Sequence, residues 1–317
     1  MSTTPVNPDC ILLNACGAAY NVKPGSNLYA PDSIYSPNVP YSADPQTACG
    51  GEGFINVATV GKCPFGIVVA FRGTLPPSVS DPDSWLDWLQ NFFAVPASSP
   101  SGPNQLPGQV HSGFFNATTE IIQQVHELVL ALEPGPANPV YVTGHSKGGA
   151  LATIAAYLLS HNLDVPNVQP VVAIASPRPG DPAFRDGFQA VLQQTRYEND
   201  GDVVPLVPAS LEFAARLLDN PFLVRSAAGK RLSLKLKSAQ NWNYVPVGTM
   251  QFVTSDFRVI SDETLTAQKL DVANEFVEDL LKKNFSSFGE AHTLLPGRGY
   301  NSGICAVLPG DAGRPTV

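Results

Sequence analysis

One short segment combines a nucleophilic side chain with a very tight backbone. In VYVTGHSKGGALA, Ser146 lies between Gly144 and Gly148, after four strand-prone residues and before a run of small, helix-forming ones. In the pattern G-x-S-x-G at a strand-to-helix turn, only glycine fits on either side of the serine. The hydroxyl is held outward, beside backbone N–H groups that stabilise negative charge. A glycine-rich turn with an incidental serine is the alternative, but the flanking strand and helix favour a nucleophile.

A serine hydroxyl is a poor nucleophile on its own and requires a general base, which a carboxylate orients. Where G-x-S-x-G joins a strand to a helix, the carboxylate and then the histidine follow the serine in the chain. The sequence has five histidines. Four of them precede Ser146, adjoin it or end the helix that it opens: His111, His126, His145 and His161. His292 is therefore the candidate base.

The carboxylate is expected just after a later strand, because the loops that follow the strands form the ligand-binding edge of such a sheet. The segment ENDGDVVPLVP supplies three candidates, Glu198, Asp200 and Asp202. The local pattern alone does not choose among them.

The rest of the chain alternates apolar strands with helices, which positions these groups. A hairpin is predicted over Phe54–Val60 and Phe65–Phe71, and further elements follow it. They are strands at Gly66–Thr74, Val140–Thr143 and Pro170–Ser176, and helices at Asn116–Glu133, Ala150–Ser160 and Ala183–Gln194. Short continuous apolar strands between helices predict an α/β fold, with a mainly parallel central sheet covered by helices on both faces. No linker interrupts the pattern, so a single domain over residues 1–317 is predicted.

Three later segments depart from this alternation. Leu211–Asp219 has the spacing of a short amphipathic helix, and Arg231–Ser238 alternates leucine with polar residues like a half-exposed strand. Ser261–Asn284 is predicted to form a long surface helix.

Composition excludes several classes of function. The net charge of −8 argues against a nucleic-acid partner, which requires clustered positive charge. No apolar run reaches about 20 residues, so no transmembrane segment is predicted. The first residues lack the features of a secretory signal, so either the protein stays in the cell or the sequence begins after a removed signal. The low charged fraction, 15%, with 30 prolines and 26 glycines, favours an extracellular protein.

The five cysteines are too few for a disulfide scaffold and lack the paired spacing of a zinc site. Cys49 and Cys63 flank the predicted hairpin, and an oxidising compartment would allow them to cross-link its base. The alternative is that all five are free thiols.

Several segments together resemble the fungal-type, class 3 triacylglycerol lipases of the α/β-hydrolase superfamily. The segments AFRGT, SWLDWLQNF, VHSGFFNA, VTGHSKGGALA, ASPRPGDPAF, NDGDVVPLVP and AH occur in the family's order from about Phe71 to His292. The resemblance implies that Ser146 is the nucleophile, Asp202 the acid of the triad and His292 the general base. It implies that Thr74 and Lys147 donate backbone N–H groups to the oxyanion. It implies no metal and no organic cofactor.

The family's lid corresponds to residues 75–93. Leu75–Ser84 contains three prolines, which would suit a hinge. Large apolar residues follow, and four of them are candidate lid or substrate-binding residues: Trp85, Leu86, Trp88 and Leu89. They either cover the active site and meet lipid on opening, or pack a helix into the core.

Two features depart from the family. Lys147 replaces an apolar residue; its side chain either turns away to pair with a carboxylate, which we favour, or selects substrates that carry a negative group. An insertion is predicted at about residues 209–240, with a small basic cluster interpreted as a solvated excursion rather than an anionic-interface contact. Arg72 and Arg178 are interpreted as members of buried ion pairs that anchor loops.

The predicted function is that of a serine carboxylic-ester hydrolase, a triacylglycerol lipase that acts through an acyl-enzyme on Ser146. An esterase for short-chain, aryl or polymeric esters would use the same triad. A non-catalytic binding protein with a hydrolase fold is the alternative from another class. The expected partner is a lipid or another ester substrate. The sequence does not predict an oligomeric state.

Overall fold

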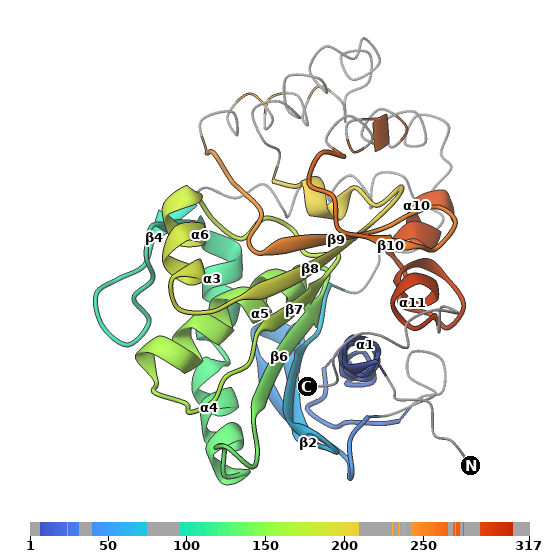
Figure 1. Cartoon of the computed structure of the whole chain (residues 1–317). Coiled ribbons are helices and arrows are strands. Elements are labelled where there is room, and N and C mark those ends of the chain that lie inside the picture. The colour runs from blue at the N-terminus through green and yellow to red at the C-terminus, as the bar shows by residue number, and fades with distance from the viewer. Residues whose placement is uncertain are drawn as a thin grey trace, which may run out of the picture.

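The computed structural model has a central sheet between two layers of helices (Figure 1). It describes residues 7–23, 25–31, 40–74, 96–208, 230, 234, 237, 242–265, 269, 271, 272, 275 and 286–306. The predicted lid at 75–93 and the predicted helix Leu211–Asp219 lie outside the described residues, as does most of the predicted insertion.

The described part of the chain forms one eight-stranded sheet in the order β1-β2-β3-β6-β7-β8-β9-β10. In chain order its strands are β1 (Gln46–Gly50), β2 (Asn56–Cys63), β3 (Gly66–Phe71), β6 (Val140–His145), β7 (Val171–Ile174), β8 (Gln194–Asn199), β9 (Thr249–Val253) and β10 (Val259–Ile260). The pairs from β3 to β9 are parallel, and the outer pairs are antiparallel. A separate ribbon pairs β4 (Pro96–Ser98) with β5 (Gln109–His111).

Helices cover both faces of this sheet, as the alternation predicts. One layer contains α3 (Ser112–Thr119), α4 (Ile122–Ala131), α5 (Lys147–Tyr157) and α6 (Pro182–Gln189); the other contains α1 (Pro8–Ala19) and α11 (Gly299–Ile304), which α10 (Ser286–His292) precedes. Successive residues of a strand point to opposite faces. In β3, Val69 and Phe71 therefore belong to the core under α3–α5, while Val68 and Ala70 contact the core under α1 and α11.

The helix predicted over Asn116–Glu133 is two helices in the structure. Within α3 the hydroxyls of Thr118 and Thr119 donate to the carbonyls of Phe114 and Asn116, a pattern that bends helices. The chain then leaves helical geometry at Ile121, where φ is −121°. The junction exposes Glu120, whose carboxylate accepts a hydrogen bond from the side chain of Asn56 in β2.

The prediction of a strand over Arg231–Ser238 is wrong where the structure describes that segment. Leu234 and Lys237 are helical, as is Lys230 before them. Alternating leucines also fall four residues apart, which places them on one helix face. Leucine and lysine are better helix formers than strand formers, so propensity decides the structure.

The helix predicted over Ser261–Asn284 begins later than expected. Residues 261–265 form a loop and turn after β10, and Lys269, Asp271, Val272 and Glu275 are helical.

Two N-terminal elements escape prediction from the pattern. Most residues of α1 are buried all round, so they lack the amphipathic period that reveals a surface helix. Strand β1 is short and edges the sheet beside β2.

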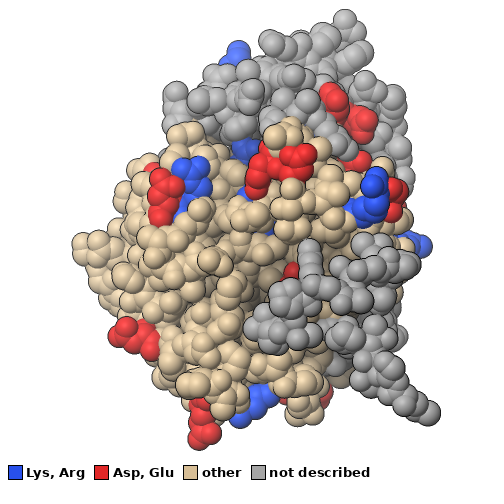
Figure 2. Space-filling view, viewed as in Figure 1, with Lys and Arg blue, Asp and Glu red and all other residues tan. Residues whose placement is uncertain are grey.

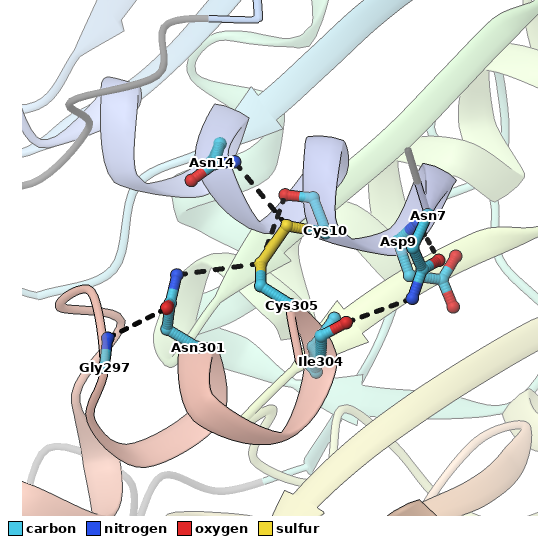
Figure 3. The surroundings of a disulfide bond; sticks show 8 residues. All are labelled: Asn7, Asp9, Cys10, Asn14, Gly297, Asn301, Ile304 and Cys305. Carbon is cyan, nitrogen blue, oxygen red and sulfur yellow. Dashed lines mark hydrogen bonds between the residues drawn. A yellow bond between two sulfur atoms is a disulfide. The ribbon is translucent and has the colours of Figure 1, made fainter. Parts of the chain in front are cut away.

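A disulfide joins Cys10 in α1 to Cys305 directly after α11, with 4.9 Å between the two Cα atoms (Figure 3). The Asn7 side chain adds a hydrogen bond to the carbonyl of Ile304. The two ends of the described chain are thus fastened together on one face of the sheet.

This pairing contradicts both sequence-based expectations for the cysteines. Cys49 and Cys63 are buried free thiols, as is Cys16. Cys49 lies opposite Val57 across the β1–β2 ladder, and Cys63 lies six residues further along β2. At about 3.3 Å per residue this places them about 20 Å apart, which is too far for a disulfide.

We expect the purified, unreduced protein to show three titratable thiols in denaturant and five after reduction. Cys10→Ser is expected to lower the free energy of unfolding by about 4 kcal/mol, because the bond closes a very long loop. Urea denaturation with and without reductant measures this, and the Cys10→Ser/Cys305→Ser double variant serves as the control that reductant leaves unchanged. Five thiols before reduction would contradict the pairing.

Uncharged residues dominate the face in Figure 2, where acidic and basic side chains stand in small, separated groups. This fits the 15% charged fraction. Across the described residues, no helix combines the length and apolarity that crossing a bilayer requires.

Candidate active site

Ser146 occupies the sharp turn between β6 and α5 that the sequence predicts. Its backbone has φ 58° and ψ −134°, a conformation that costs free energy in any residue other than glycine. Glycine is required on both sides. A Cβ on Gly144 would lie 2.0 Å from the carbonyl oxygen of Gly148, and one on Gly148 would lie 2.1 Å from that of Phe71. The Ser146 hydroxyl is buried and makes no hydrogen bond with the described residues.

His292 and Asp202 form a pair at the same edge of the sheet. His292 ends α10, and its Nδ1 lies 2.9 Å from Oδ2 of Asp202, in the loop after β8. The Asp202 side chain is fully buried and that of His292 is 13% exposed. Oδ1 of Asp202 also accepts the backbone N–H of Val204, which fixes the plane of the carboxylate.

Tyr300 in α11 also holds the carboxylate, and sequence reasoning missed this residue. Its hydroxyl donates to Oδ2 of Asp202 at 2.7 Å and accepts the backbone N–H of Asn199 at 3.0 Å. Burial and the neighbouring carboxylate raise its pKa well above the ordinary value, so the hydroxyl stays protonated. No local pattern marks Tyr300, because its partners lie about 100 positions earlier in the chain.

His145 adjoins the serine, and its ring binds the main chain of His292. Its Nε2 lies 2.9 Å from the carbonyl oxygen of His292, and its Nδ1 lies 2.8 Å from the Tyr20 hydroxyl. Burial lowers the pKa of His145 well below its usual value. The neutral ring therefore donates from Nε2 and accepts from Tyr20 at Nδ1. The ring centroids of His145 and His292 lie 4.6 Å apart, so the His292 ring lies beside the turn at Ser146.

Two backbone segments border Ser146. A Cβ on Gly73 would lie 2.8 Å from the Cβ of Ser146, so the Arg72–Thr74 segment passes directly against the serine. Lys147 follows the serine and begins α5, where backbone N–H groups lack partners within the helix. Thr74 and Lys147, the predicted oxyanion donors, thus belong to the two segments that meet at Ser146.

Residues 68–212 match the sequence profile of the family described as Lipase (class 3). The likeness to the class 3 lipases thus covers a little under half of the chain. Among its relatives is phospholipase A(1) DAD1, chloroplastic, of Arabidopsis thaliana, 27% identical over 57% of this chain and 42% of the relative. Secreted mono- and diacylglycerol lipase 3 of Gibberella zeae is 29% identical over 45% of each chain. The chain therefore spans less than half the length of these two relatives.

The Rhizomucor miehei lipase, in its native propeptide complex, shares the fold, with a TM-score of 0.54. The match covers 94% of this chain and 81% of that chain at 21% sequence identity. The parallel sheet with helices on both faces is thus the α/β-hydrolase fold of the lipases.

Among the described residues, Arg72 anchors a loop through backbone carbonyls and not through the ion pair that we predicted. Its guanidinium donates to the backbone carbonyls of Val22, Phe54 and Ile55 at 2.6–3.2 Å. These carbonyl oxygens bind Nη1 and Nη2 of the guanidinium, while its buried Nε has no hydrogen-bond partner among the described residues.

The predicted ion pair of Arg178 is also absent among the described residues. Its Nε and Nη1 are buried without a hydrogen-bond partner, and burial lowers its pKa to about 10. Glu198 lies near enough to oppose this shift, but its carboxylate is bound by Arg196 and Lys269 at 2.8 and 2.5 Å.

The four residues assigned to the class 3 lid, Trp85, Leu86, Trp88 and Leu89, lie outside the described residues. Their two alternative roles therefore stay predictions.

Proposed function

We propose that the protein is a serine hydrolase of carboxylic esters, with Ser146 as nucleophile, His292 as general base and Asp202 as the orienting acid. The observation that carries this proposal is the buried His292–Asp202 pair, held beside a strained serine turn at the carboxyl ends of parallel strands. The match of residues 68–212 to the class 3 lipase profile supports it.

In the proposed cycle, Ser146 Oγ attacks the ester carbonyl while His292 takes its proton. The tetrahedral intermediate collapses to an acyl-enzyme, and His292 gives the proton to the departing alcohol. Water, activated by His292, then attacks the acyl-enzyme and releases the acid. Asp202 stabilises the imidazolium in both half-reactions.

The backbone N–H groups of Thr74 and Lys147 are proposed to hold the oxyanion of each tetrahedral intermediate. One such donor contributes about 3 kcal/mol to transition-state stabilisation in serine hydrolases. The proposed cycle uses no metal and no organic cofactor.

We infer that the substrate is a glycerolipid ester, with a long-chain triacylglycerol as the first candidate. Two relatives support the class: one is named a phospholipase A(1) and the other a mono- and diacylglycerol lipase. A short-chain, aryl or polymer esterase is the alternative with the same triad.

Hydrolysis of emulsified long-chain triglyceride, of phosphatidylcholine vesicles and of soluble p-nitrophenyl butyrate tests the proposal, with Ser146→Ala as the blank. Cleavage of the emulsion by the wild type alone supports a lipase, and preference for the vesicles supports a phospholipase. Cleavage of the butyrate alone indicates an esterase. Equal rates for the wild type and Ser146→Ala on all three substrates would contradict the catalytic proposal and favour a non-catalytic binding protein.

We also infer that the protein works outside a reducing cytosol, because the Cys10–Cys305 disulfide requires an oxidising compartment to persist. Thiol titration of protein isolated from its natural host tests this: finding the two cysteines reduced there would contradict it.

A further inference from the structure

Lys147 stands where a positive charge is unfavourable. It is the half-buried first residue of α5, and the N-terminus of a helix carries partial positive charge. No acidic residue lies in the first turn of α5 to compensate. Burial of an ammonium group also costs free energy unless it is paired. A lysine kept at this position requires specific contacts.

Those contacts form a chain of hydrogen bonds between three elements. Lys147 Nζ donates to Oδ1 of Asn56 at 2.6 Å, and Nδ2 of Asn56 donates to Oε2 of Glu120 at 2.6 Å. Asn56, the first residue of β2, is buried with 4% exposure. In the described part of the chain Lys147 forms no direct ion pair. The partner of the ammonium is therefore an amide, and the carboxylate of Glu120 lies one hydrogen bond further on.

A second buried cation, Arg72, lies beside these hydrogen bonds. Arg72 is held by backbone carbonyls, and no carboxylate among the described residues forms an ion pair with it. Burial, and then repulsion from Arg72, lower the pKa of Lys147 to about 8, while Glu120 opposes the shift. These are the charged groups that face the ammonium from the described elements around it.

The same series of hydrogen bonds connects the two segments that carry the proposed oxyanion donors. Val57, next to Asn56 in β2, accepts the backbone N–H of Arg72 at 2.9 Å, and Arg72 leads through Gly73 to Thr74. The bond from Lys147 to Asn56 therefore fastens the start of α5 to the strand that supports the Thr74 segment.

We propose that Lys147 is a positioning residue for the oxyanion hole. Through Asn56 its ammonium holds the start of α5 against the Thr74 segment. Its positive charge, added to that of Arg72, stabilises the oxyanion of the tetrahedral intermediate, which the backbone N–H of Lys147 binds. The proposal rests on the proposed ester hydrolysis, and it assigns the Lys147 side chain no contact with substrate.

The expected signature is a loss of kcat in alkaline solution. Lys147 loses its proton as the pH rises through about 8, so kcat on p-nitrophenyl butyrate, corrected for spontaneous hydrolysis, is expected to fall with that midpoint. Lys147→Met is expected to lower kcat at pH 7 about tenfold to fiftyfold, with KM nearly unchanged. The variant is expected to show no further fall near pH 8.

Two substitutions separate charge from shape. Lys147→Arg keeps the charge at every accessible pH, so it is expected to retain most of kcat without the alkaline fall. Asn56→Asp places a carboxylate against the ammonium, and the midpoint is expected to move to higher pH. The matched control is Lys62→Met, which removes an exposed lysine at the far end of β2 and is expected to leave the profile unchanged.

Folding stability provides a readout independent of catalysis. The unfolded chain binds the Lys147 proton up to its ordinary pKa of 10.5, whereas the folded chain releases it at about 8. Between these values the unfolded state binds more protons, so wild-type stability is expected to gain from this group as the pH rises. That gain is expected to be absent in Lys147→Met.

The outcomes separate this proposal from the proposed function. If the wild type hydrolyses the butyrate and Ser146→Ala does not, ester hydrolysis stands whatever Lys147 does. Wild-type kcat in Lys147→Met, or an alkaline fall that persists in it, would overturn the positioning role. A loss of activity several-fold larger on anionic phosphatidylglycerol than on neutral triglyceride would also overturn it, because that result assigns Lys147 to substrate recognition. Equal losses on both substrates are expected.

Discussion

Ser146→Ala is expected to lower kcat on a soluble ester about 10⁶-fold. The residual activity is what substrate binding and the oxyanion donors provide on their own. The nucleophile is removed, and neither His292 nor water replaces it at the strained turn. Rates on p-nitrophenyl butyrate measure the loss, with active-site titration by an organophosphate to exclude contaminating wild type.

The same variant is expected to fold at least as stably as the wild type. The Ser146 hydroxyl is buried and has no hydrogen-bond partner among the described residues, so its removal relieves about 1 kcal/mol of desolvation cost. The matched control is Ser176→Ala, because Ser176 lies against Gly149 of α5 and donates only to the adjacent Pro177 carbonyl. Activity within tenfold of wild type in Ser146→Ala would contradict the assignment, as would a comparable loss in Ser176→Ala.

The local part of this site could be predicted from sequence, because the constraint on it is local. The turn at Ser146 requires glycine at fixed offsets, and the order of groups along the chain leaves only His292 as base. Three carboxyl groups near the end of β8 satisfied the same local pattern. In the structure Oδ2 of Asp202, the acid that the family resemblance proposed, lies 2.9 Å from Nδ1 of His292.

The supporting contacts could not be predicted, because they join positions far apart in the chain. Tyr300 reaches Asp202, Tyr20 reaches His145, and Lys147 reaches Asn56 91 positions earlier. Each partner is one polar residue without a periodic or motif signal. The same limit explains why the disulfide was not predicted. Their positions beside the hairpin favoured Cys49 and Cys63, whereas the fold brings Cys10 and Cys305, 295 positions apart in the chain, together.

Asp202→Asn is expected to lower kcat about 10⁴-fold, with a much smaller change in KM. In the wild type Asp202 only accepts, so the Nδ1 that faces it must carry a proton, which leaves Nε2 to act as the base. Tyr300 and His292 share Oδ2 of Asp202, while the Val204 N–H holds Oδ1; an asparagine whose oxygen keeps the Val204 N–H therefore turns its NH₂ toward His292. An amide donor at Nδ1 favours the opposite tautomer, which places a proton where the base is needed.

The control for Asp202→Asn is Asp200→Asn, two residues earlier in the same loop and open as a candidate on local pattern alone. It is expected to retain kcat within about threefold, because the carboxylate that faces Nδ1 of His292 at 2.9 Å is that of Asp202. Circular dichroism and urea denaturation establish that both variants fold. If Asp200→Asn lost more activity than Asp202→Asn, the orienting role would move to Asp200. Equal and small losses in both would contradict the orienting role of Asp202.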